Sequence, residues 1–105
     1  MVKIVNSNEF NEEIKEGIVF VDFFANWCGP CKMLSPIVDE VSNEISDVKF
    51  IKVDVDASSD IAATYSIMSI PTLMIFKDGN LVAKQMGLLP KSALIDFINS
   101  TLTKN

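Results

Sequence analysis

Residues 18–25 form an almost continuous apolar run, and this run constrains the fold of the 105-residue chain more than any other feature. A strand with one face in water alternates apolar and polar residues, whereas an unbroken apolar run is typical of a central strand that is covered on both faces. A single charged residue, Asp22, interrupts the run. The pattern therefore predicts a sheet that carries helices on both of its faces.

Strand and helix patterns alternate along the rest of the chain. Strands are expected at residues 2–5, 18–25, 48–55, 72–76 and 81–85, and turn residues 77–80 join the last two as a hairpin. Helices are expected between Asn6 and Gly17, from Cys28 to Ile45 with a kink at Pro36, from Ser58 or Ser59 to Tyr65, and from Pro90 in a first turn to Leu102. Crossover helices make the early strands parallel, and the hairpin adds an antiparallel edge. The predicted fold class is α/β, one domain of residues 1–105 with a central mixed β-sheet flanked by helices on both faces.

Charge and residue usage argue against several classes of function. The net charge is −5, the nine basic residues are all lysines, and the chain contains neither arginine nor histidine. An acidic domain without arginine is a poor candidate for binding nucleic acid or an anionic membrane surface. Without histidine, catalysis by a Ser-His or Cys-His pair is excluded, as is histidine ligation of a metal. No segment resembles a signal peptide or a membrane span, so we expect a cytoplasmic protein.

Two cysteines, Cys28 and Cys31, open the helix that follows the apolar run. Their i, i+3 spacing allows a disulfide that closes a very small loop and is easy to open. At a helix N-terminus, free N–H groups and the helix dipole stabilise a thiolate at Cys28 and make it nucleophilic. Cys31, one turn deeper, is then placed to attack a mixed disulfide formed at Cys28. The residues alone leave two alternatives open: a pair of inert thiols, or half of a metal site shared between two chains.

The segment around this pair, FANWCGPCK at residues 24–32, resembles the active-site segment of the thioredoxin family. Segments similar to other parts of that family follow in the expected order: VDVD at 53–56, SIPT at 69–72, FKDG at 76–79 and MG at 86–87. The resemblance covers nearly the whole chain and implies the thioredoxin fold and reduction of disulfides in other proteins. It also implies no cofactor beyond a redox-active Cys28–Cys31 disulfide, and recharging by a thioredoxin reductase. Two positions depart from the family pattern: Phe24 stands where tryptophan is usual, and Leu88 where alanine is commoner.

Asp22 and Lys52 are the candidate residues that support the dithiol. Burial within the apolar run is expected to raise the pKa of Asp22, and the family gives the matching aspartate the role of accepting the Cys31 proton. The alternative for Asp22 is a buried carboxylate that hydrogen bonds or a lysine satisfy. Lys52 interrupts the apolar strand at 48–55, which makes it the natural charge partner of Asp22. An outward, solvated Lys52 is an equally open interpretation.

A substrate-docking surface is also implied by the resemblance, because the family places a cis proline beside the dithiol. A cis bond before Pro71 would turn the Ile70 backbone toward the site, where it can pair with an extended substrate. The expected surface consists of Trp27, Gly29, Ile70, Pro71 and Gly87. Between the cysteines, Gly29 and Pro30 carry no charged or donor side chain that would further stabilise the thiolate, which favours a reductant over an oxidant.

The hypothesis from the sequence is a monomeric thiol-disulfide oxidoreductase that reduces disulfide-containing proteins and needs no metal. A second hypothesis, from another class, is a redox-silent binding module that uses the same apolar surface as a subunit of a larger enzyme. Replacing Cys28 and Cys31 by serine separates the two, because a binding module would keep its function. A metal-binding dimer is a third hypothesis, which metal content and mass would test.

Overall fold

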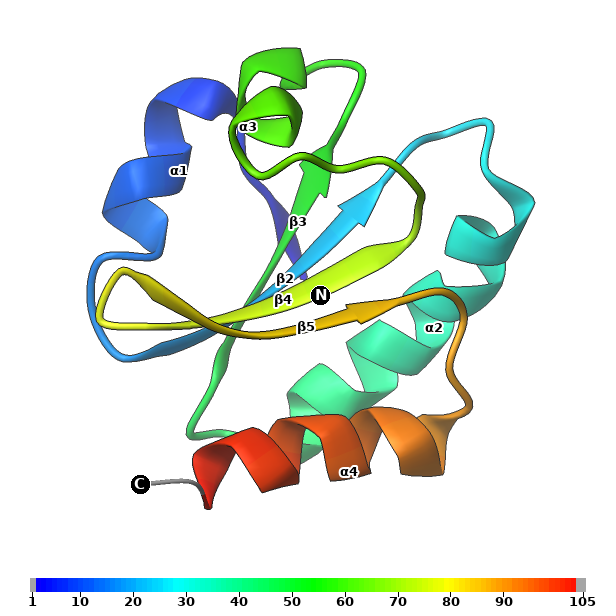
Figure 1. The fold of residues 1–105 in the computed structure, drawn as a ribbon. Coiled ribbons are helices and arrows are strands. Elements are labelled where there is room, and N and C mark those ends of the chain that lie inside the picture. The colour runs from blue at the N-terminus through cyan, green and yellow to red at the C-terminus, as the bar shows by residue number, and fades with distance from the viewer. Residues whose placement is uncertain (1, 104–105) are drawn as a thin grey trace.

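One five-stranded sheet runs through the computed structural model, which describes residues 2–103, and helices pack on both of its faces (Figure 1). The strands are β1 (Lys3–Ile4), β2 (Ile18–Phe24), β3 (Lys49–Asp54), β4 (Thr72–Lys77) and β5 (Asn80–Met86). The helices are α1 (Ser7–Glu13), α2 (Gly29–Glu44), α3 (Ser59–Thr64) and α4 (Lys91–Leu102). No helix in this described range is long and apolar enough to cross a membrane.

The strand order in the sheet is β1-β3-β2-β4-β5. Strands β1 and β2 both run parallel to β3, whereas β4 is antiparallel to β2, and β5 is antiparallel to β4. The predicted mixed sheet, with early parallel strands and an antiparallel hairpin at the edge, is therefore confirmed. Strand β2 lies at the centre of this sheet, which explains why the segment is almost entirely apolar.

The side chains of β2 alternate between two separate cores, because successive residues of a strand point to opposite faces. One core, beneath α1 and α3, takes Val19, Val21 and Phe23 from β2. The other core, beneath α2 and α4, takes Phe20 from β2. Asp22 and Phe24 follow Phe20 at the period of two, which directs them to the α2 face of the sheet.

Short local signals in the sequence predict several element ends correctly. Helix α1 begins with the expected capping box, since the Asn6 side chain accepts from the Glu9 amide and the Glu9 side chain accepts from the Asn6 amide, both at 3.0 Å. Strands β4 and β5 meet at Asp78 and Gly79, whose φ angles are +49° and +86°. Two central residues with positive φ match the right-handed twist of a two-residue hairpin.

Other boundaries differ from the prediction. Strand β1 is only two residues long. Pro90 is the residue before α4 rather than part of its first turn, because its backbone is extended (ψ 160°) while its carbonyl accepts the first helical N–H, from Leu94, at 3.0 Å. Ser58 precedes α3 but makes no side-chain capping bond. Helix α2 contains Pro36, as predicted, but begins and ends one residue inside the predicted bounds, at Gly29 and Glu44.

Candidate functional site

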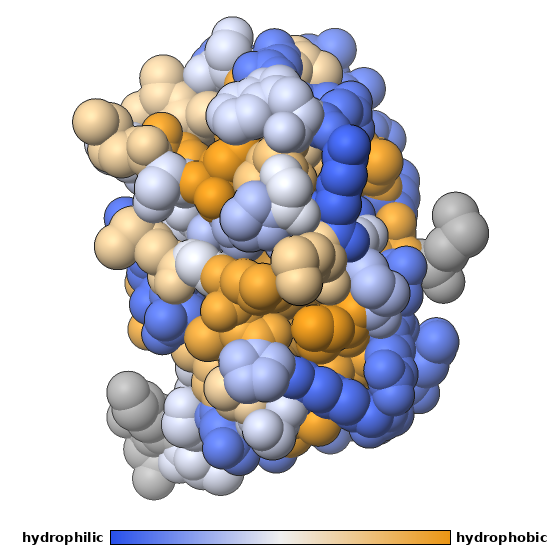
Figure 2. All heavy atoms as spheres, turned by 90° about the vertical axis from the view of Figure 1, so that its right-hand side faces the viewer, coloured by the Kyte–Doolittle hydropathy of each residue, from blue (hydrophilic) through white to orange (hydrophobic). Residues whose placement is uncertain are grey.

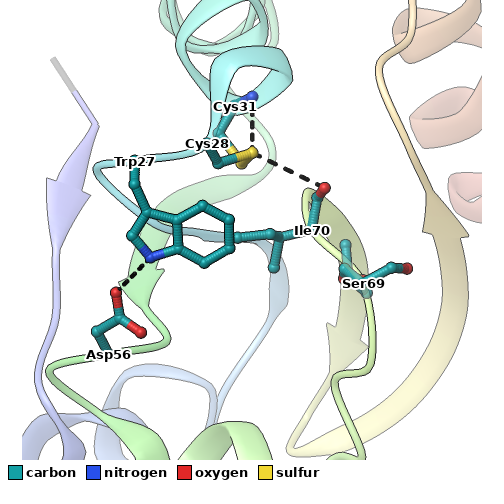
Figure 3. Close-up of a disulfide and its surroundings, with 7 residues drawn as sticks. Trp27, Cys28, Cys31, Asp56, Ser69 and Ile70 are labelled. Atoms are coloured by element: carbon teal, nitrogen blue, oxygen red, sulfur yellow. Dashed lines mark hydrogen bonds between the residues drawn. A yellow bond between two sulfur atoms is a disulfide. The ribbon is translucent and has the colours of Figure 1, made fainter.

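The site lies where β2 ends and α2 begins, and a disulfide between Cys28 and Cys31 marks it (Figure 3). Cys28 is the N-cap residue of α2, and its Sγ accepts a hydrogen bond from the Cys31 amide at 3.2 Å. Pro30 has no N–H, and Cys31 is the residue of the first turn that donates to this sulfur. The geometry supplies a helix N–H and the positive end of the helix dipole to a thiolate at Cys28.

Both cysteines are almost fully buried, with exposed fractions of 4% for Cys28 and 3% for Cys31. Access to either sulfur therefore requires close docking of a partner on the surrounding surface. Trp27, the residue before the disulfide, is by contrast 70% exposed. A large aromatic side chain is therefore exposed next to the buried disulfide.

The Ile70–Pro71 segment borders the disulfide and contains the cis peptide bond that the family resemblance implies. The carbonyl oxygen of Ile70 lies 3.8 Å from Cys28 Sγ, as the dashed line in Figure 3 indicates. The Pro71 carbonyl in turn accepts a hydrogen bond from the Gly87 amide at 2.8 Å. Gly87 has a φ of +93°, a backbone conformation that residues other than glycine rarely adopt. Gly87 thus contacts the Ile70–Pro71 segment that borders Cys28, although fifteen residues or more separate it from these two residues in sequence.

Trp27 is held by a contact that the sequence interpretation did not assign. Its indole N–H donates to the Asp56 carboxylate at 2.8 Å (Figure 3). Asp54 supports this arrangement, because its carboxylate accepts from the Asp56 amide at 2.9 Å and from the Asn26 side chain at 3.4 Å. The VDVD segment was the available signal, but nothing in it indicated which side chain would reach Trp27.

An apolar groove of about 190 Å³ runs beside Trp27. Its lining consists of Trp27, Val55, Ile67, Met68, Ser69 and Ile70. Met68 is 92% exposed at the edge of this groove. Figure 2 views the side of the molecule that contains the β2–α2 and β5–α4 connections, and it shows hydrophobic side chains gathered near the middle of this side, with hydrophilic side chains along much of the right-hand edge. Such a surface suits an apolar stretch of polypeptide better than a small polar ligand.

Asp22 is completely buried on the α2 face of β2. Neither of its carboxylate oxygens has a hydrogen-bond partner among the described residues. Burial raises the pKa of Asp22 to about 6, Lys52 opposes this rise, and Asp39 adds to it. The expected rise in the pKa of Asp22 is therefore present, and its main cause is the expected one.

Lys52 is the cross-strand neighbour of Asp22 in the parallel pairing of β2 and β3. It forms no ion pair with a carboxylate in the part of the chain that the structure describes. Its amine donates to Ser35 Oγ at 2.8 Å and lies 4.7 Å from the centre of the Phe24 ring. Lys52 thus acts on Asp22 electrostatically without forming a direct ion pair, and its side chain is half-buried rather than fully solvated.

Ser35 is a second residue that the sequence interpretation missed. It lies on α2 four residues after Cys31, so both residues are on the same side of the helix. A cavity of about 140 Å³ is lined by Cys31, Ser35, Lys52 and Phe24, among others. The i, i+4 relation to Cys31 could have drawn attention to Ser35, but the position of Lys52 above it depends on β3.

Gly29 and Pro30 occupy the first two positions of α2, between the cysteines. Nothing lies within 4 Å of a Cβ built on Gly29, so this side of the helix start is open. No group of three histidine, cysteine, aspartate or glutamate residues within 2–103 is arranged to hold a metal ion.

Comparisons with known proteins agree with this geometry. Residues 1–100 match the family model described as Thioredoxin. Curated relatives include "Thioredoxin" from Chlamydia pneumoniae, 50% identical over 94% of this chain and 97% of that one, and "Thioredoxin" from Bacillus subtilis, 46% identical over 89% and 90%. A solved structure titled as a Plasmodium falciparum thioredoxin matches with a TM-score of 0.89 and 42% identity, covering 94% of this chain and 98% of that one.

Proposed function

The chain belongs to the thioredoxin family and is a thiol-disulfide oxidoreductase with the thioredoxin fold, and from this premise we propose that Cys28 is its attacking thiol and Cys31 its resolving thiol. The single observation that carries this assignment is the hydrogen bond from the Cys31 amide to Cys28 Sγ at the N-terminus of α2. In the reduced protein, a donor at this position stabilises the Cys28 thiolate, which is the nucleophilic form of the cysteine. The family uses no cofactor beyond the redox-active disulfide.

The reaction then runs in two exchange steps. The Cys28 thiolate attacks one sulfur of a substrate disulfide, the substrate S–S bond breaks, and one substrate cysteine leaves as a thiolate. Cys31 loses its proton and attacks Cys28 Sγ in the mixed disulfide, which releases the second substrate thiolate. The substrate gains two electrons and, with two protons, becomes a dithiol, while Cys28 and Cys31 are oxidised to the disulfide seen in the structure.

Asp22 is the proposed acceptor of the Cys31 proton. Its pKa of about 6 makes it a stronger base than an ordinary aspartate while it is still mostly ionised at pH 7. Burial without a hydrogen-bond partner supports this role, because an unpaired buried carboxylate gains from taking up a proton. Lys52 opposes part of the rise in the pKa of Asp22, and in doing so it helps to keep Asp22 ionised at pH 7 and able to accept a proton.

The proposed docking surface consists of Trp27, Gly29, Ile70, Pro71 and Gly87, with Gly29 and Pro30 also shaping the helix start between the cysteines. The contact between Ile70 and Cys28 supports this assignment, as does the hydrogen bond between Gly87 and Pro71. An extended substrate segment that pairs with the Ile70 backbone would bring its disulfide to Cys28.

The partners follow from the family: disulfide-containing proteins are its substrates, and a thioredoxin reductase recharges it. We propose that this protein acts as a monomer and as one domain, because Cys28, Cys31, Asp22 and the docking surface all belong to one chain. We also propose that it works in the cytoplasm, where glutathione and thioredoxin systems keep such thiols reduced.

A trapping experiment tests the order of the two thiols. Cys31→Ser should accumulate a stable mixed disulfide between Cys28 and a substrate protein, because the resolving thiol is missing. Cys28→Ser is the matched control and should trap nothing. Non-reducing gels and mass spectrometry of the adduct measure both outcomes, and trapping by Cys28→Ser alone would overturn the assignment.

A further inference from the structure

Three elements hold the amine of Lys52 in one position. The lysine extends from β3, its Nζ donates to Ser35 Oγ on α2 at 2.8 Å, and it lies 4.7 Å from the centre of the Phe24 ring of β2. A cation above an aromatic face is attracted to the ring. The hydroxyl and the ring together therefore define where the positive charge stands.

This position of the Lys52 amine is unexpected, because Asp22, its neighbour across the sheet, is left without a direct partner. Asp22 and Lys52 are paired across β2 and β3, and side chains at paired positions project to the same face of the sheet. Yet the Asp22 oxygens have no hydrogen-bond partner among the described residues, and no Lys52–carboxylate pair lies within 4.0 Å there. Buried charges in proteins are ordinarily paired, so a direct contact between Lys52 and Asp22 would be the ordinary arrangement.

Few other charges surround Asp22. Lys52 on β3 and Asp39 on α2 are the charged groups that affect its ionisation. On the opposite side of β2, its register partner on β4 is the apolar Leu73. Lys52 is consequently the cation that offsets part of the effect of burial on this carboxylate.

Resting on the proposed role of Asp22, we propose that Ser35 is a positioning residue for the resolving step: its hydroxyl holds the Lys52 ammonium against Phe24 and prevents a direct ion pair with Asp22. Asp22 then remains basic enough to take the Cys31 proton. A closer ammonium would stabilise the carboxylate and make it a weaker base. Ser35 does not touch the reacting sulfurs, so it acts through Lys52.

Ser35→Ala tests this proposal in the disulfide form, in which neither cysteine titrates. Without the hydroxyl, Lys52 should move to the unpartnered Asp22, and the pKa of Asp22 should fall by about one unit. Titration of the Asp22 carboxyl carbon by ¹³C NMR measures this change. Ser35→Thr keeps the hydroxyl and should restore the wild-type value. Ser42→Ala is a matched control on α2, since the Ser42 hydroxyl donates to the backbone carbonyl of Asp39 in the same helix rather than accepting from Lys52.

A second pair of variants separates positioning from a merely structural effect. In a Lys52→Met background, Ser35→Ala should leave the pKa of Asp22 unchanged, because the cation that Ser35 positions is absent. An unchanged or raised pKa of Asp22 in Ser35→Ala alone would overturn the proposal, as would an equal fall in the Lys52→Met background.

The kinetic readout separates this inference from the proposed function. The acid limb of the pH profile for mixed-disulfide resolution should move down in pH with the pKa of Asp22, and the rate above that limb should fall about threefold or more because the base is weaker. If the pKa falls as expected but the resolution profile does not move, Ser35 still positions Lys52, and the role of Asp22 in the proposed function is wrong.

Discussion

The two faces of β2 differ sharply, although both are built from one seven-residue strand. On the α1 and α3 side, an aromatic cluster of Phe10, Phe23, Tyr65 and Phe76 packs with ring centroids 5.4–6.4 Å apart. On the α2 side, Asp22 is buried without a hydrogen-bond partner, and a cavity of about 140 Å³ lies close by, between Cys31 and Lys52. Aromatic packing of the first kind stabilises a fold, whereas an unpartnered buried carboxylate destabilises it.

Adjacent residues in the strand therefore have opposite effects on stability. Phe23 contributes to the aromatic cluster, and Asp22, one position earlier, points to the functional face. Strand alternation makes this separation possible, because a one-residue step moves a side chain from one core to the other. We infer that the α1 and α3 face supplies stability that offsets the unfavourable burial of Asp22.

The largest expected effect is on the aromatic face. Phe10→Ala removes a fully buried ring that contacts three other aromatic rings, and it should lower the free energy of unfolding by about 3–5 kcal/mol. Urea unfolding of the disulfide form measures the loss. The rate of insulin disulfide reduction per folded molecule should stay within about twofold of wild type under native conditions. A large fall in that rate would show that the two faces are not independent.

Asp22→Asn should instead raise the free energy of unfolding at neutral pH. The pKa of Asp22 is about 6 in the folded chain against an ordinary value of 3.8, so the folded state binds this proton more tightly than the unfolded state does. The penalty for ionising Asp22 therefore appears as the pH rises from about 4 to about 6 and persists above that range. Between pH 4 and pH 7, the stability of Asp22→Asn relative to wild type should rise by up to about 3 kcal/mol.

The same variant should slow resolution of the mixed disulfide by about tenfold or more, and its formation much less, because a positioned base acts only in the second step. Urea unfolding at several pH values and stopped-flow kinetics measure the two effects. Asp96→Asn on α4 replaces an exposed carboxylate and serves as the control. If the stability difference between Asp22→Asn and wild type did not vary with pH, the penalty assigned to the buried Asp22 carboxylate would be wrong, and the two faces of β2 would not differ in this way.

The smallest expected effect lies at the start of α1. Asn6→Ala removes the capping bond to the Glu9 amide and should lower the free energy of unfolding by about 1 kcal/mol. The rate of disulfide reduction should not change, since α1 packs on the face away from the dithiol. Asn11→Ala, at an exposed position of the same helix, is the matched control and should have little effect on stability. A change in the reduction rate with Asn6→Ala would link α1 to the site.

Local features of the fold and the site could be predicted because each depends on a few neighbouring residues. The apolar run predicts the central strand, the Asn6 to Glu9 spacing predicts a capping box, and the Asp78–Gly79 turn predicts a hairpin. The position of Cys28 at the start of α2 belongs to the same class, since the amide that contacts its sulfur is three residues away. Short-range geometry of this kind is largely fixed once the helix or strand forms.

Contacts between distant segments could not be predicted in the same way. Trp27 reaches Asp56, Lys52 reaches Ser35, and Gly87 meets Pro71 only after the strands have paired. Each of these contacts depends on the register between strands or on how a helix crosses the sheet, and a shift of one residue would turn the side chain to the other face.

The sequence by itself therefore determined the central strand, the order of the elements and the helix-terminal position of Cys28, because hydrophobic period and capping chemistry act over a few residues. The tertiary structure alone decided that Asp22 is left unpartnered, that Lys52 bonds to Ser35, and which loops meet beside the disulfide. The physical reason is that charge and hydrogen bonding depend on distances of a few ångströms between segments far apart in the chain, and only the packed sheet and helices set those distances.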